Sequence, residues 1–215
     1  MATLMLVFAA AAGLAARAQG APAGPIKLVA LGDSLTAGYG LPAGAAFPVV
    51  LERMLKARGH DVSIANAGVS GDTTTGGLER LDWSVPEGTD GVILELGAND
   101  MLRGVDPKVP RDALDTILER LRKRGIPVLL AGMYASRNLG PDYVARFDAI
   151  YPELAKKHEL VLYPFFLDGV AGIRELALPD GLHPTAKGVE IVAERILPAV
   201  ETFLARLPGA RRAGN

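Results

Sequence analysis

The sequence contains no cysteine, and positive and negative charges almost cancel. Its 215 residues carry a formal net charge of −1 at pH 7. Without cysteine there can be no disulfide bond, thiolate metal site or cysteine nucleophile. The balanced charge gives no electrostatic reason to expect nucleic acid as a partner. Any nucleophile in this chain must therefore come from another residue type, and we expect no nucleic-acid binding.

Aromatic residues are also scarce, at 6% of the chain, but hydrophobic residues as a whole are not. They make up 49%, which indicates a folded protein rather than a disordered one. The length suits one α/β domain with a sizeable core and is too short for two. We assign this domain to residues 26–207 and expect a polar tail at 208–215.

The N-terminal segment lacks an apolar run long enough to cross a bilayer. Its run from Leu4 to Ala16 is shorter than the about 20 residues that a spanning helix needs. An Ala-x-Ala pattern follows at residues 16–18, and residues 19–25 read as a loose linker. This pattern predicts a signal peptide at residues 1–18 and a periplasmic or secreted protein. No basic residue precedes the apolar run, so a truncated start or an uncleaved anchor remain alternatives.

Apolar runs and amphipathic segments alternate about five times along the rest of the chain. Short apolar runs indicate strands buried on both faces, and apolar residues at i, i+3 and i+4 indicate helices. Strands are predicted at residues 26–31, 62–66, 91–96, 127–133 and 160–163. Helices are predicted at residues 47–58, 73–81, 110–124, 141–158 and 186–207, with a bend or break at Pro198.

This alternation, with its short connections, predicts an α/β fold. Its sheet has about five mostly parallel strands between helices, joined by right-handed crossovers. The carboxyl ends of parallel strands share one edge of the sheet, and open α/β sheets bind their ligands there. We therefore expect functional residues directly after the predicted strands.

Small-residue loops with a polar group follow three of these strands. They read Gly32-Asp33-Ser34, Asn66-Ala67-Gly68 and Gly97-Ala98-Asn99-Asp100. A fourth segment, Asp180-Gly181-Leu182-His183-Pro184, lies just before the last helix and can reach the same edge. Taken alone, the first loop could be an ordinary turn, since Asp and Ser favour turns. The four segments together favour a shared site.

The spacing within the fourth segment suits general base catalysis. A carboxylate at Asp180 can accept a hydrogen bond from His183 three residues later and so fix the ring's tautomer and orientation. The other ring nitrogen can then take a proton from Ser34, because a neutral serine is a weak nucleophile without an adjacent base. Acyl transfer also needs donors for the oxyanion. The available groups are the backbone N–H groups of Ser34 and Gly68 and the side-chain amide of Asn99.

These four segments resemble, in the right order, the four signature blocks of the SGNH hydrolases, also called GDSL esterases and lipases. The resemblance covers the chain from about Pro25 to the last helix. It implies that Ser34 is the nucleophile, Asp180 the orienting carboxylate and His183 the base. It also implies that Ser34, Gly68 and Asn99 form the oxyanion hole.

Longer strings at residues 31–41, 66–74 and 163–166 look most like the bacterial thioesterase I, lysophospholipase and arylesterase group. This resemblance implies a three-layer α/β/α sandwich of the flavodoxin-like type. It further implies no cofactor and no metal, a periplasmic location, and small-molecule substrates, namely carbonyl esters and thioesters of medium or long acyl chains. We expect a monomer without stable membrane insertion once the signal peptide is removed.

Two other functions remain open at this point. The same fold could carry an O-deacetylase of polysaccharides or small molecules, or an acyltransferase. A periplasmic acyl-binding protein with a degenerate site is the alternative outside the enzymes. Four aromatic residues could line an acyl groove, although aromatic residues are more often part of a core: Tyr39, Trp83, Phe165 and Phe166.

Overall fold

The computed structural model describes residues 24–207. The predicted signal peptide, most of the predicted linker and the predicted tail at 208–215 lie outside the described residues. Within them the first strand begins at Ile26, where the domain was expected to start.

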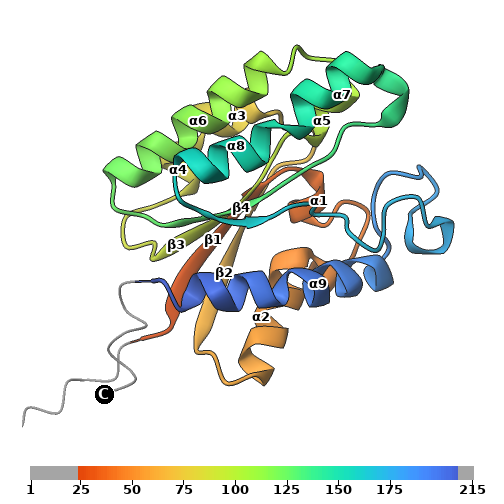
Figure 1. The fold of residues 1–215 in the computed structure, drawn as a ribbon. Coiled ribbons are helices and arrows are strands. Elements are labelled where there is room, and N and C mark those ends of the chain that lie inside the picture. Colours follow the sequence, from red (N-terminus) through yellow and green to blue (C-terminus); the bar gives the residue numbers. More distant parts are fainter. Residues whose placement is uncertain (1–23, 208–215) are drawn as a thin grey trace, which may run out of the picture.

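A single parallel sheet forms the centre of the molecule (Figure 1). Its strand order is β2-β1-β3-β4-β5, and every neighbouring pair is parallel. This order is the doubly wound, flavodoxin-like one, in which strand order reverses beside β1. The predicted fold class is therefore confirmed. The strands are β1 (Ile26–Gly32), β2 (Val62–Gly68), β3 (Gly91–Glu95), β4 (Val128–Ala131) and β5 (Val161–Tyr163).

Helices cover both faces of the sheet and complete the three layers. In the view of Figure 1, α2 (Phe47–Ala57) and α9 (Ala186–Leu204) lie together below the sheet. The opposite face is covered chiefly by α3 (Thr74–Glu79), α6 (Lys108–Lys123) and α8 (Ile150–Lys157). Because helices cover both faces, the inner strands β3 and β4 are buried along their whole length.

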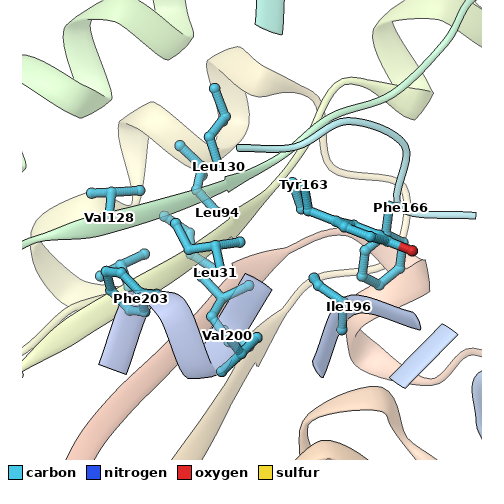
Figure 2. Packing of buried hydrophobic residues seen from close by; sticks show 14 of the residues in the cluster. Leu31, Leu94, Val128, Leu130, Tyr163, Phe166, Ile196, Val200 and Phe203 are labelled. Carbon is cyan, nitrogen blue, oxygen red and sulfur yellow. The ribbon is translucent and has the colours of Figure 1, made fainter. Parts of the chain in front are cut away.

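The largest helix buries its apolar stripe against the sheet (Figure 2). Ile196, Val200 and Phe203 of α9 are at most 2% exposed. They face sheet residues that are equally buried, such as Leu31 and Leu94. Full burial of one such side chain stabilises the fold by roughly 1.5–3 kcal/mol. This packing makes the sheet a rigid support for the loops at its carboxyl edge.

Two predicted helices differ from the observed ones, and proline matters in both. The helix predicted at residues 141–158 is divided into α7 (Pro141–Asp148) and α8. Pro152 lacks the N–H that would bond to the Asp148 carbonyl, which explains the interruption. The break expected at Pro198 does not occur, since α9 continues through it. Burial of the stripe on both sides of Pro198 offsets the missing hydrogen bond.

Three short helices were not predicted. They are α1 (Ser34–Ala37), α4 (Leu81–Ser84) and α5 (Ala98–Leu102). Two of them, α1 and α5, begin in the loops where polar site residues were expected. The structure also has short 3-10 turns at Ala43–Ala45, Arg137–Leu139 and Arg174–Leu176. Among residues 24–207, no helix combines the length and hydropathy that a bilayer crossing requires.

Candidate active site

Ser34 is the first residue of α1, two residues after the end of β1, and lies at the carboxyl edge of the sheet. Asp33 caps the helix, because its Oδ1 accepts a hydrogen bond from the Leu35 N–H at 2.9 Å. Ser34 is the first residue of the helix, so its own N–H has no partner within the helix. Its side chain is nearly buried, and the residue is 8% exposed. The turn therefore presents both a hydroxyl and a backbone donor.

His183 approaches Ser34 from the loop that precedes α9. Its Nε2 lies 2.8 Å from Ser34 Oγ, and its Nδ1 lies 2.7 Å from Asp180 Oδ2. A carboxylate only accepts, so Nδ1 is the protonated nitrogen and Nε2 accepts the serine proton. Ser34, His183 and Asp180 thus form a continuous hydrogen-bond chain across residues far apart in the sequence.

Asp180 is held ready for this contact by its own turn. Its Oδ1 accepts the N–H groups of Leu182 and His183 at 2.9 and 3.0 Å. The His183 N–H, the Leu182 N–H and the imidazole together lower the pKa of the Asp180 carboxyl to about 2. Asp180 is therefore a carboxylate throughout the neutral pH range and can stabilise a positive charge on His183.

Asn99 contributes a side-chain amide to the site from the start of α5. It lies in the first turn of α5, just after β3 ends. Its Nδ2 donates to Asp33 Oδ2 at 3.1 Å. The amide carries two N–H groups, so one remains available to the pocket. The structure thus brings together Ser34, Asn99, Asp180 and His183 as expected.

The fifth predicted residue, Gly68, is placed differently. It belongs to β2, which continues two residues beyond the predicted end, and its N–H donates to Asn66 Oδ1 at 2.9 Å. A Cβ at this position would lie 2.3 Å from the Ala37 nitrogen, so glycine is needed here to let α1 pack closely. Gly68 does not line the pocket that contains Ser34. Its predicted place in the oxyanion hole is therefore not supported by this geometry.

Gly71 lies three residues beyond Gly68, further along the same loop. It lines the pocket with Ser34 and Asn99, and its φ of +82° is a backbone conformation that favours glycine. Within residues 24–207 its N–H has no hydrogen-bond partner, and its carbonyl accepts from Arg103 at 2.7 Å. The sequence does contain a signal, because Gly71 is the second glycine of the same loop.

A pocket of about 270 Å³ opens beside Ser34. Ser34, Asn99 and His183 line it, and most of the other lining residues are apolar. Tyr39 lines it and lies with its ring 4.5 Å from the His183 ring. Of the other aromatic candidates, Trp83 is 84% exposed and outside this pocket, whereas Phe166 belongs to the core. The apolar wall consists of Leu35, Ala98, Met101, Leu102, Met133, Leu167 and Leu182.

A second hollow, of about 320 Å³, lies at the opposite edge of the sheet, around the starts of β4 and β5. It contains Arg122 and His158 but no hydroxyl nucleophile. In the part of the chain that the structure describes, no cluster of three His, Asp or Glu side chains could hold a metal ion.

A parallel α/β sheet with a Ser–His–Asp hydrogen-bond chain at its carboxyl edge defines the class of α/β serine hydrolases. Residues 30–191 match the GDSL-like Lipase/Acylhydrolase family. The chain belongs to this family and is a hydrolase of esters or thioesters.

Named relatives share much of the chain. Esterase TesA of Pseudomonas aeruginosa is 35% identical over 82% of this chain and 89% of its own length. An arylesterase of Vibrio mimicus is 40% identical over 78% and 84%. Thioesterase 1/protease 1/lysophospholipase L1 of Escherichia coli K12 is 36% identical over 78% and 79%. Among solved structures, the SGNH-hydrolase family esterase AlinE4 is 45% identical and superposes with a TM-score of 0.72, covering 86% of this chain and 99% of AlinE4.

Proposed function

We propose that the protein hydrolyses acyl esters and thioesters through an acyl-serine intermediate on Ser34. His183 Nε2 takes the Ser34 proton as Oγ attacks the carbonyl carbon. The imidazolium that forms then protonates the leaving alkoxide or thiolate. Water then attacks the acyl carbon and gives a proton to His183, and His183 returns this proton to Ser34 Oγ as the bond between Oγ and the acyl carbon breaks, which releases the acyl group as a carboxylic acid. The observation that carries this proposal is the chain of contacts from Ser34 Oγ through His183 to Asp180, at 2.8 and 2.7 Å.

The tetrahedral intermediate in both steps carries a negatively charged oxygen. We assign its stabilisation to the N–H groups of Ser34 and Gly71 and to Asn99 Nδ2. These donors come from three segments at one sheet edge, and all three residues line the pocket. A well-aimed donor of this kind contributes about 3 kcal/mol to lowering the barrier.

The lining of the pocket supports an apolar acyl chain as the substrate group bound beside Ser34. Apart from the catalytic residues it is formed mainly by leucine and methionine side chains, with few polar groups. The names of the relatives include arylesterase, thioesterase and lysophospholipase, which fits a carbonyl substrate with different leaving groups. An O-deacetylase needs room only for an acetyl group, so the apolar wall favours a hydrolase of substrates with longer acyl chains.

Replacing the nucleophile tests this mechanism. Ser34→Ala should lower kcat for p-nitrophenyl acyl esters by several orders of magnitude while the thermal unfolding curve stays unchanged. Ser136→Ala, at an exposed serine of the loop after β4, is the matched control and should keep full activity. Activity that survives in Ser34→Ala would refute the assignment. An acyl-chain series extends the test, because a preference for acetate over longer chains would favour the deacetylase.

We also propose export of the chain with residues 1–18 as a signal peptide, residues 19–25 as a linker, and residues 26–207 as a monomeric hydrolase domain. The support is the apolar run followed by Ala16-Arg17-Ala18. Expression of the full chain in a Gram-negative host, followed by N-terminal sequencing of periplasmic enzyme, should place Gln19 first. An active product that keeps Met1 would contradict cleavage.

A further inference from the structure

Asp33 is a carboxylate without any exposed surface, directly beside the nucleophile. Its two oxygens have separate tasks. Oδ1 accepts the Leu35 N–H at 2.9 Å, and Oδ2 accepts Asn99 Nδ2 at 3.1 Å. Burying a carboxylate is costly, and a helix cap alone does not require one, because Ser, Thr or Asn cap equally well. The second contact therefore needs its own explanation.

The contact with Asp33 determines which way the Asn99 amide faces. The nitrogen and oxygen of an asparagine amide have nearly the same shape, so packing alone does not select between its two orientations. A carboxylate can only accept hydrogen bonds and therefore selects Nδ2. With one N–H directed at Asp33, the second N–H of the same nitrogen remains for the pocket. The flipped amide would present its oxygen to the developing oxyanion and repel it.

We propose that Asp33 is a positioning residue that acts through Asn99 by keeping the amide nitrogen turned toward the oxyanion. This inference rests on the proposed function, because it assigns the donor orientation on which that mechanism depends. Asp33 itself transfers no proton. Asn cannot replace Asp33. If the side chain introduced by Asp33→Asn used its oxygen to accept the Leu35 N–H, its NH₂ group would face the Asn99 NH₂ group, and two donors cannot form a hydrogen bond.

Several charged or titratable groups surround Asp33 and define the conditions of the test. His183, Asp72 and Glu95 all interact electrostatically with the Asp33 carboxyl. Burial, as the main cause, raises the pKa of the Asp33 carboxyl to about 6. At pH 8 Asp33 is therefore ionised and accepts through both oxygens, so kinetics belong at that pH.

The test is a double-mutant cycle at pH 8 with a p-nitrophenyl acyl ester. We expect Asp33→Asn to lower kcat about 100-fold and to leave KM within about twofold, as for loss of one oxyanion donor. Asn99→Ala should have an effect of similar size. In the Asn99→Ala background, Asp33→Asn should then lower kcat by less than about threefold, because its target is already gone.

Asp100→Asn is the matched control. Asp100 is also buried, is adjacent to Asn99 in the sequence, and its carboxylate accepts from the N–H and the hydroxyl of Thr74. This variant should keep kcat within about threefold even if it unfolds at a lower temperature. Circular dichroism and thermal unfolding verify that each variant is folded.

Three results would overturn the inference. The first is an Asp33→Asn enzyme with undiminished kcat, and the second is a pair of effects that multiply in the double variant. The third is a shift in the pH profile of kcat/KM that persists in the Asn99→Ala background, because Asp33 would then act through His183. Failure of the proposed function itself would appear separately, as activity retained in Ser34→Ala.

Discussion

At the scale of single residues, two glycines of one loop have different roles. Gly68 gives its N–H to Asn66 Oδ1, and its lack of a side chain allows contact with Ala37. Gly71 turns its backbone toward the pocket. The two positions are separated by one tight turn, in which the Asp72 N–H donates to the Val69 carbonyl at 3.1 Å. A change that alters only the surroundings of Gly68 can distinguish them.

Asn66→Ala is that change. It removes the acceptor of the Gly68 N–H and the weaker bond from Asn66 Nδ2 to the Ala37 carbonyl at 3.3 Å. Because Gly68 lies outside the pocket, kcat should change by less than about threefold. The free energy of unfolding should fall by about 1 kcal/mol for the lost hydrogen bond. Steady-state kinetics and urea unfolding measure the two effects. A change in kcat of tenfold or more would return Gly68 to the oxyanion hole.

The polar residues of the site were predicted from the sequence, but the glycine was predicted to be Gly68 rather than Gly71. Ser34, Asn99, Asp180 and His183 were predicted because their chemistry is specific and each lies directly after a predicted strand or just before a predicted helix. A glycine offers only a backbone N–H, and the direction of that N–H depends on where the strand ends. The prediction ended the second strand at Asn66, whereas β2 continues to Gly68. Because β2 includes Gly68, the available backbone N–H is that of Gly71, in the turn that follows the strand.

At the scale of elements, Arg80 joins the ends of two strands to the loop that carries Gly71. Its Nη2 donates to the Gly32 carbonyl at 2.8 Å, and its Nη1 donates to the Ala67 carbonyl at 2.9 Å. Its Nε donates to Asp72 Oδ2 at 2.6 Å, and the pair is largely buried. One guanidinium thus holds the ends of β1 and β2 and the loop that carries Gly71 in fixed positions relative to each other.

Arg80→Lys should weaken both stability and turnover. A lysine ammonium is a point charge and cannot reproduce the planar fork that reaches two carbonyls and a carboxylate. We expect the free energy of unfolding to fall by about 3 kcal/mol, since Asp72 loses a buried partner. We also expect kcat to fall about tenfold, because the loop with Gly71 is less well held. Differential scanning fluorimetry and steady-state kinetics measure both.

Arg122→Lys provides the comparison for this prediction. Arg122 is on α6 and makes no ion pair within the described part of the chain. The lysine variant should match the parent protein in both assays. Equal behaviour of Arg80→Lys and Arg122→Lys would show that the contacts of Arg80 are dispensable.

Element prediction succeeded where burial sets a long pattern and failed where it does not. The strands and the helices α2, α6 and α9 were predicted because their apolar residues recur over many positions. The helices α1, α4 and α5 have four or five residues each, too few for such a pattern. An isolated helix of this length is unstable in water and forms here only because the fold fixes its ends. Both α1 and α5 nevertheless carry site residues.

At the scale of the whole molecule, the same sheet edge that holds the site also buries acidic groups. Glu95 ends β3 opposite Gly32 and is 1% exposed. Its Oε2 accepts from Thr36 Oγ1 at 2.8 Å, and its Oε1 has no partner among the described residues. Burial and the nearby Asp33 carboxylate raise the pKa of Glu95 well above its ordinary value. Glu95 therefore remains protonated in the folded protein at pH values where the unfolded chain has released that proton.

This protonation makes the stability of the molecule dependent on pH, and Glu95→Gln should remove part of that dependence. Between the pKa of Glu95 in the unfolded chain and its raised value in the fold, the folded state binds more protons. The free energy of unfolding therefore falls as pH rises, by about 1.4 kcal/mol per pH unit for one proton. The raised pKa of the Asp33 carboxyl also makes the free energy of unfolding fall as pH rises, but mainly below that pKa of about 6.

Urea unfolding at pH values above the ordinary pKa of a glutamate should thus give a shallower decline for Glu95→Gln than for the parent protein. Glu87→Gln, at an exposed site, should leave the decline unchanged. Parallel curves for the parent and Glu95→Gln would mean that Glu95 is already ionised in the fold.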